Sequence, residues 1–196
     1  MKFAFAFLAV AAAATVTHAL TVTSTTTIKG CSTQELQTFL ATPTNWPSIV
    51  ASSFGAEEAD VDPKSPRSKI NPIDRPLKKG ERVKEVFGLP PVLPLYVTWT
   101  CQQNTVRKPK KVKGVNNSGG GGNLEFFSAE GLGGIAENCR MRFDITSAGD
   151  AETTVDMTVE LDPVSFIGNL AGPVLKVDND LALKVLLPLA LKKKIE

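Results

Sequence analysis

Histidine is almost absent from this chain of 196 residues. The one histidine, His18, lies in an N-terminal segment with the features of a secretory signal. Lys2 gives that segment a positive start, residues 3–14 are apolar, and residues 17–19 supply small side chains around a cleavage point. Once the segment is removed, no histidine remains for a Ser-His or Cys-His pair or for a metal ligand. The sequence therefore predicts neither a metal site nor histidine-based catalysis.

We interpret residues 1–19 as a signal peptide and residues 20–196 as one domain, since 42% hydrophobic residues suit a sizeable core. The apolar run is too short to span a bilayer comfortably, and strand-like sequence follows it directly. The alternatives are a retained anchor or a misassigned first strand. A signal peptide predicts the secretory pathway, with a secreted or endomembrane-lumenal product, or alternatively a plastid reached by that route.

Cysteine is also scarce. Cys31, Cys101 and Cys139 lack the C-x-x-C spacing of zinc and thioredoxin-type sites. An odd number leaves at least one free thiol in an oxidising compartment. If the strands pair in sequential order, Cys101 and Cys139 lie about 10 Å apart, too far for a disulfide. The pattern favours buried, unpaired thiols.

The net charge of +2 is too small to indicate a nucleic-acid partner. A basic run opens residues 107–123, which we interpret as a long hairpin loop rich in Gly and Asn. No aromatic residues interleave with the run, as a nucleic-acid platform requires, and no Gly-Lys-Ser/Thr follows the glycines, as a P-loop requires. The run is either a solvated face or a contact with an anionic membrane, to which Lys192–Lys194 could add. Its basic residues are Arg107, Lys108, Lys110, Lys111 and Lys113.

Asn116 opens a glycosylation sequon on the same loop. A signal peptide would make modification there sterically plausible. A glycan at this position would argue against close docking of the loop on a membrane.

The N-terminal half predicts one strand, two short helices and an irregular insertion. Residues 21–29 are rich in threonine and β-branched side chains, which favours a strand. Ser32 and Glu35 form a capping box that starts a helix ending near Pro43, with a second short apolar piece directly after it. Residues 55–80 contain four prolines and predict an insertion with at most one short strand.

From Glu81 to Leu161 apolar and polar residues alternate, which is typical of antiparallel strands with one wet face. The sequence from Pro163 to Ile195 then predicts one long helix, which begins at Pro163 and is broken or kinked at Pro173 and Pro188. Its apolar residues recur at spacings of three and four, at Ile167, Leu170, Val174, Val177, Leu181, Val185 and Leu189.

The order of elements and a short motif together resemble the START-like (SRPBCC) superfamily, which includes polyketide cyclase/dehydrase-like and coenzyme Q-binding-like proteins. Residues 40–47, Leu-Ala-Thr-Pro-Thr-Asn-Trp-Pro, are similar to that family's segment after the first helix, supported by residues 80–83, residues 96–100 and the terminal helix. The resemblance implies an α+β helix-grip fold: a curved antiparallel sheet wrapped around a long C-terminal helix. It also implies a cavity between them for sterols, phospholipids, isoprenoids or polyketides. The insertion at 55–80 and the loop at 107–123 depart from the family pattern.

Alternation predicts which side chains line such a cavity, with a solid core as the alternative. The lining expected from the sheet is Leu95, Val97, Trp99, Phe126, Met141, Phe143, Met157 and Val159, and the lining expected from the helix is Val177, Leu181 and Val185.

Glu137 and Glu85 share the apolar face by parity, where burial would raise the carboxyl pKa as acid–base chemistry requires. The alternative is a position near solvent, or a bulge that reverses the parity. Tyr96 is a further candidate for this chemistry. The family has no catalytic residue common to all members that could be transferred here.

The leading hypothesis is a monomeric protein that binds a hydrophobic small molecule without chemistry, cofactor or nucleic acid. The alternatives are a polyketide cyclase-like or dehydratase-like enzyme, using Glu137, Glu85 or Tyr96, and a structural domain with a filled core.

Overall fold

The computed structural model describes residues 19–59, 72–89, 93–107, 120–149 and 152–195. Its strands form one antiparallel sheet in the order β1-β7-β6-β5-β4-β3-β2. The strands are β1 (Leu20–Lys29), β2 (Ser53–Glu58), β3 (Arg82–Leu89), β4 (Leu93–Arg107), β5 (Gly121–Ser128), β6 (Ala136–Gly149) and β7 (Glu152–Pro163).

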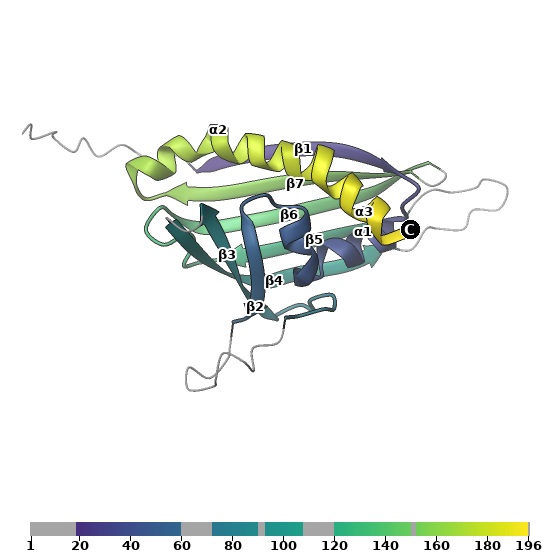
Figure 1. Cartoon of the computed structure of the whole chain (residues 1–196), viewed down its shortest axis with the longest axis horizontal. Coiled ribbons are helices and arrows are strands. Elements are labelled where there is room, and N and C mark those ends of the chain that lie inside the picture. The colour runs from purple at the N-terminus through teal and green to yellow at the C-terminus, as the bar shows by residue number, and fades with distance from the viewer. Residues whose placement is uncertain (1–18, 60–71, 90–92, 108–119, 150–151, 196) are drawn as a thin grey trace, which may run out of the picture.

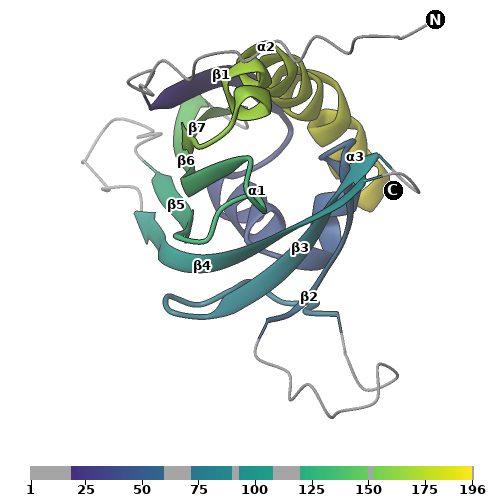
Figure 2. The same ribbon diagram turned by 90° about the vertical axis from the view of Figure 1, so that its left-hand side faces the viewer.

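Strands consecutive in the sequence pair with one another from β2 to β7, and β1 then pairs with β7. The helices are α1 (Thr33–Leu40), the 3₁₀ helix η1 (Pro43–Ser48), α2 (Phe166–Leu181), the π-helical segment η3 (Ala182–Leu186) and α3 (Leu187–Ile195). The sheet curls in an arc, with α1 and the terminal helices on its concave side (Figures 1 and 2). This is the α+β helix-grip architecture that the sequence predicted.

The first helix begins where its capping box predicts. The Ser32 hydroxyl accepts the backbone N–H of Glu35, and the Glu35 carboxylate accepts the backbone N–H of Ser32. The buried indole of Trp46 in η1 donates to the carbonyl of Leu40 at 2.8 Å and meets Phe126 edge-on. The Asn-Trp-Pro segment therefore fixes the connection after α1 against the sheet.

The terminal helix starts and changes character at different places from those predicted. Pro163 ends β7, and α2 begins at Phe166 after Ser165, whose hydroxyl accepts the N–H of Gly168. No break occurs at Pro173, which lies within α2. The irregularity is η3, directly before Pro188, because a proline inside a helix removes one backbone donor and crowds the preceding turn.

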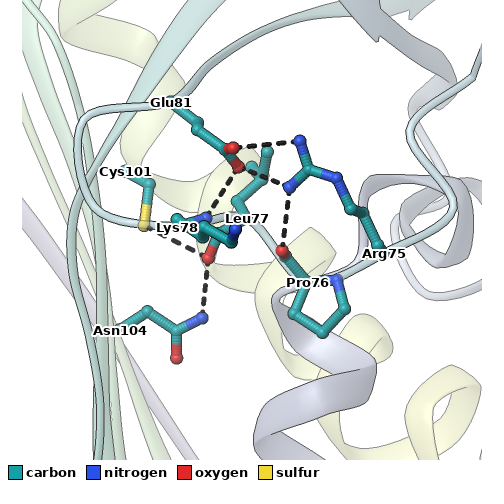
Figure 3. Close-up of polar contacts among 7 residues, drawn as sticks. All are labelled: Arg75, Pro76, Leu77, Lys78, Glu81, Cys101 and Asn104. Carbon is teal, nitrogen blue, oxygen red and sulfur yellow. Dashed lines mark hydrogen bonds and ion pairs between the residues drawn. The ribbon is translucent and has the colours of Figure 1, made fainter.

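The last part of the predicted insertion, residues 72–80, is fastened to the end of α1 and to β4, and Figure 3 shows its contacts with Glu81 and with Asn104 of β4. The backbone N–H of Leu77 donates to the carbonyl of Ala41, and the Asn104 amide donates to the carbonyl of Leu77 at 2.8 Å. Arg75 pairs with Glu81 at 2.7 Å and holds the pKa of that carboxyl below its usual range. Leu77 is fully buried, so this segment closes one side of the core. The expected short strand of the insertion is β2, and residues 60–71 lie outside the described part.

The cysteines are buried and unpaired, as predicted. Burial raises the thiol pKa of Cys101 and of Cys139 to about 11, which makes both poor nucleophiles. Across the described ranges, none of the helices is both long and apolar enough to span a bilayer.

Candidate ligand site

The concave face of the sheet is a continuous apolar surface set by the strand register. Directly paired residues on antiparallel strands point to the same side. Phe126 pairs with Cys101 and with Met141, and Met141 pairs with Val159, which places one apolar row across four strands. Phe143 pairs with Met157 in the next row.

The eight sheet residues expected on this face differ only in their degree of burial. Val97, Trp99, Phe126, Phe143 and Met157 are buried, and Leu95, Met141 and Val159 are half-buried. Their inward placement agrees with the prediction, while contact with a ligand stays a prediction.

The three helix residues expected in the cavity are on the wrong face. Val177 is 69% exposed, Leu181 38% and Val185 45%. The inward side of the terminal helix instead carries an inner row, Asn179, Leu183, Leu187 and Leu191, all buried. The sequence contains two apolar rows on this helix, and the spacings of three and four on which the prediction rests describe the outer one.

The π-helical segment keeps the inner row on the buried side of the helix. Residues four apart drift by about 40° per step around an α-helix, so a row with that spacing would leave the sheet within a few turns. In η3 the N–H of Leu187 bonds to the carbonyl of Ala182, five residues back. The wider turn lowers the rotation per residue and returns Leu187 and Leu191 to the buried side.

Glu85 is the most unusual side chain on the concave face, because it is a carboxyl with only 1% exposure. Its Oε1 accepts from the Ser53 hydroxyl at 2.6 Å, and its Oε2 accepts from the Trp99 indole N–H at 2.8 Å. Burial raises the Glu85 pKa to about 7, against these two hydrogen bonds, and Asp178 adds to the rise. Near neutral pH Glu85 can therefore donate or accept a proton, and its predicted inward position is confirmed.

The terminal helix contributes two more polar groups that are at least partly buried, Asp178 and Asn179. Asp178 accepts from the Ser52 hydroxyl at 3.2 Å, and partial burial raises its pKa. Asn179 is 4% exposed, and its Nδ2 has no hydrogen-bond partner among the described residues. A buried unpaired amide costs about 1–3 kcal/mol, so a group that accepts from Asn179 would be stabilised there.

Glu137 and Tyr96 do not face the interior. Glu137 is exposed, because a bulge between Glu137 and Arg140 shifts the register of β6 and places Asn138 in the left-handed region at φ 49°. Tyr96 is 49% exposed on the outer face, where the Lys84 ammonium lies 4.4 Å from its ring centroid. Neither can act as an acid or base on a molecule held inside.

A second buried amide is the side chain of Gln37, a residue of α1. Gln37 donates to Asn104 at 2.7 Å and to the carbonyl of Thr105 at 3.0 Å, while its Oε1 has no partner among the described residues. A Cβ at position 122 would lie 1.7 Å from that oxygen. The expected loop glycine Gly122 is thus part of β5, where only glycine leaves room for Gln37.

An open hollow of about 530 Å³ lies beside α1 and α3. It is lined by Cys31, Ser32, Gln34, Glu35, Thr38, Phe39 and Leu191. Two of its polar residues, Ser32 and Glu35, are already engaged in the capping box. No group of three His, Cys, Asp or Glu side chains suitable for a metal occurs in the part of the chain that is described.

The sequence pattern identified Glu85 and its partner Trp99 on the inward face, but not Ser53, Asp178 or Asn179. Ser53 opens β2 just before the predicted insertion at 55–80, and neither Asp178 nor Asn179 belongs to the apolar row that predicted the inward side of the helix. The spacing of four that joins Asn179 to Leu183 and Leu187 was the available signal.

Several predicted features fall outside the described residues. They are residues 1–18 of the signal peptide, Lys108, Lys110, Lys111, Lys113 and Asn116. Arg107, at the end of β4, is described, and its guanidinium donates to the side chain of Asn123.

No family model and no curated protein matches this sequence. Solved structures do match. The Zhui aromatase/cyclase from Streptomyces sp. R1128 has a TM-score of 0.59 at 11% identity, covering 91% of this chain and 97% of that one. Norcoclaurine synthase from Thalictrum flavum has a TM-score of 0.55 at 11% identity, covering 91% and 98%. A START superfamily protein from Mycobacterium smegmatis has a TM-score of 0.50 at 13% identity, covering 90% and 97%.

Identities this low carry the fold and not the activity. The strand order, the concave face with α1 and the terminal helix, and these likenesses agree with one another. The chain has a START-like, helix-grip fold.

Proposed function

We propose that this protein binds a hydrophobic small molecule between the concave face of the sheet and the terminal helix. The observation that carries the proposal is the buried amide of Asn179, which lies on the side of the helix that meets the sheet and whose Nδ2 has no hydrogen-bond partner among the described residues. A purely structural core would gain stability from an apolar residue at position 179, whereas a ligand site uses a polar group such as this amide to orient the bound molecule.

The polar groups favour a particular kind of ligand. Asn179 offers an N–H donor, and Glu85 and Asp178 are carboxyls whose pKa values are raised by burial. An anionic ligand head beside Asp178, and beside Glu85 when Glu85 is ionised, would be repelled, because burial leaves little solvent to screen the charges. The site therefore suits a largely apolar molecule with a neutral carbonyl, hydroxyl or ether oxygen.

The likeness to solved structures supports this proposal in general terms. An aromatase/cyclase and a START superfamily protein share the fold over nearly their whole lengths. The identity of the ligand and the compartment do not follow from the fold. We propose, from the N-terminal segment alone, that the chain enters the secretory pathway.

Native mass spectrometry of the purified chain tests the proposal, followed by titration of the extracted protein with a neutral solvatochromic dye such as Nile red. We expect a co-purifying neutral molecule that displaces the dye. The Asn179→Leu variant should bind the dye normally and the co-purified molecule several-fold more weakly. The matched control is Asn169→Leu, since Asn169 lies on the same helix and is exposed. If the protein retains no molecule and binds no dye, the binding proposal is wrong and the alternative of a structural domain with a filled core is favoured.

A second function, acid–base catalysis on the bound molecule, is favoured by the pKa of about 7 at Glu85. Both oxygens of Glu85 are engaged by Ser53 and Trp99, which supports a holding role over proton transfer. The Glu85→Gln variant separates the two roles. If the protein is an enzyme, Glu85→Gln should lose conversion of the co-purified molecule and keep its affinity for it. If the protein only binds the molecule, neither the unmodified chain nor the variant should convert it.

A further inference from the structure

The outer side of the terminal helix is apolar along its length and exposed. We call the exposed residues the outer row: Val174, Val177, Leu181, Val185 and Leu189, with exposures of 69%, 69%, 38%, 45% and 60%. Single exposed aliphatic residues are ordinary, but five in one row on one helix are not. No described element covers this side of α2 and α3 (Figures 1 and 2).

The π-helical segment keeps the outer row straight as well as the inner one. Val177, Leu181, Val185 and Leu189 are each four residues apart, a spacing that an uninterrupted α-helix would wind around its axis. Because η3 lowers the rotation per residue, the row continues on one side from α2 into α3.

Lysines border the row. Lys176 and Lys184 both contact the carboxylate of Asp180, at 3.0 and 3.1 Å, and the Lys176 ammonium also donates to the carbonyl of Thr23 in β1 at 2.7 Å. Lys192 and Lys193 are exposed near the C-terminal end of the helix. The remaining carboxylate, Asp178, is half-buried and bonded to Ser52. The surface is therefore apolar along the helix and most basic at its C-terminal end, at Lys192 and Lys193.

We propose that the outer row and its lysines dock the protein on an anionic lipid bilayer, with the helix lying in the interface. An apolar row flanked by lysines is the pattern of helices that bind in the plane of a membrane. Each lysine close to an anionic leaflet contributes to the attraction, which falls within a Debye length. The proposal concerns the opposite side of the helix from the ligand site and does not depend on it.

A second copy of the chain fits this surface less well. A two-fold contact would place the same row against itself in antiparallel register. Lys192 and Lys193 of one copy would then lie near the Lys176–Asp180–Lys184 group of the other, whose formal net charge is positive, so no net negative charge would meet them across the contact. The lipid surface supplies negative charge where a second copy supplies positive charge.

Co-sedimentation with vesicles tests the proposal on the full chain, using phosphatidylcholine alone and phosphatidylcholine mixed with phosphatidylserine. We expect binding to the mixed vesicles that weakens as salt rises. The double variant Val177→Ser/Val185→Ser should reduce the partition coefficient about tenfold or more. The double variant Lys192→Gln/Lys193→Gln should reduce it about tenfold on the mixed vesicles only.

The matched control is Val106→Ser, which removes a valine of 49% exposure from β4, away from the helix. It should bind like the unmodified chain. All forms share residues 1–18, so a difference between them reports the helix. Circular dichroism establishes that each variant is folded.

Three results would overturn the proposal. One is an unmodified chain that does not bind the mixed vesicles. Another is equal binding by the valine variant and its control. The third is a dimer in light scattering that Val177→Ser/Val185→Ser dissociates, which would make the outer row an interface between two copies.

Discussion

The two faces of the terminal helix have almost the same aliphatic composition and opposite surroundings. The inner row contains Leu183, Leu187 and Leu191, all at most 5% exposed, and includes Asn179. The outer row is wholly aliphatic and largely exposed. Hydrophobicity alone therefore does not tell which face of this helix packs on the sheet. The more polar row is the buried one, which is the arrangement expected where an interior must hold a functional group.

The largest expected effect is a direct test of this difference between faces. Leu187→Ala should lower the free energy of unfolding by about 3 kcal/mol, because it leaves a cavity at a fully buried position. Leu189→Ala, two residues away and 60% exposed, should change it by less than about 0.5 kcal/mol. Urea denaturation of both variants measures the contrast. Similar losses for the two leucines would show that the outer row is also packed.

The next effect is the pH dependence of stability that the buried carboxyl of Glu85 produces. Glu85 keeps its proton up to about pH 7 in the folded state, while an unfolded glutamate loses it near its ordinary value of 4.5. The folded state binds more protons between these values, so stability should fall as pH rises from about 4.5 to about 7, by up to about 3 kcal/mol.

Glu85→Gln should remove most of that slope and be more stable than the unmodified chain at pH 8. Denaturation at a series of pH values checks it. The residual slope should reflect Asp178, whose pKa is also raised. Parallel profiles for the two proteins would mean that Glu85 is accessible to solvent.

Asn179 allows a smaller test on the inner row itself. Asn179→Leu should raise the free energy of unfolding of the ligand-free chain by about 1 kcal/mol, because it removes an unpaired buried amide and keeps a similar volume. Thermal unfolding of extracted protein measures the gain. A marked loss of stability would indicate that the amide is satisfied in solution and has a structural role.

The smallest expected effect concerns the hydrogen bond between Asp178 of the terminal helix and Ser52, the residue before β2. Ser52→Ala removes the hydrogen bond to Asp178 and should cost about 0.5 kcal/mol at neutral pH. The cost should shrink at low pH, where Asp178 becomes protonated and accepts more weakly. Chemical denaturation at pH 4 and pH 7 tests this, and an equal cost at both would show that the hydrogen bond does not depend on the charge.

Local signals identified most of the elements before the structure did. The capping box of Ser32 and Glu35 placed α1, and alternation placed the apolar faces of β3 to β7. Parity also brought Glu85 inside. It failed for Glu137, because a single extra residue in a bulge reverses which face the following side chains occupy. A bulge depends on the partner strand, and the sequence of β6 alone carries no signal strong enough to locate it.

The candidate site depends on contacts that are distant in sequence. The hydroxyl of Ser53 reaches Glu85 from β2, the indole of Trp99 reaches it from β4, and Asp178 approaches from the far end of the chain. Each of these residues is unremarkable in its local window. Their chemistry arises only when the sheet curls and the helix closes over it.

By itself the sequence determined the order of the elements and the alternation of the strands, and these, with the resemblance at residues 40–47, were enough to predict the helix-grip fold. The tertiary structure decided which row of the terminal helix turns inward, because rotation about a helix axis is fixed by packing and not by local propensity. It also decided that Glu85 keeps its proton near neutral pH, because the carboxyl is desolvated only when the sheet and the helix exclude water from it.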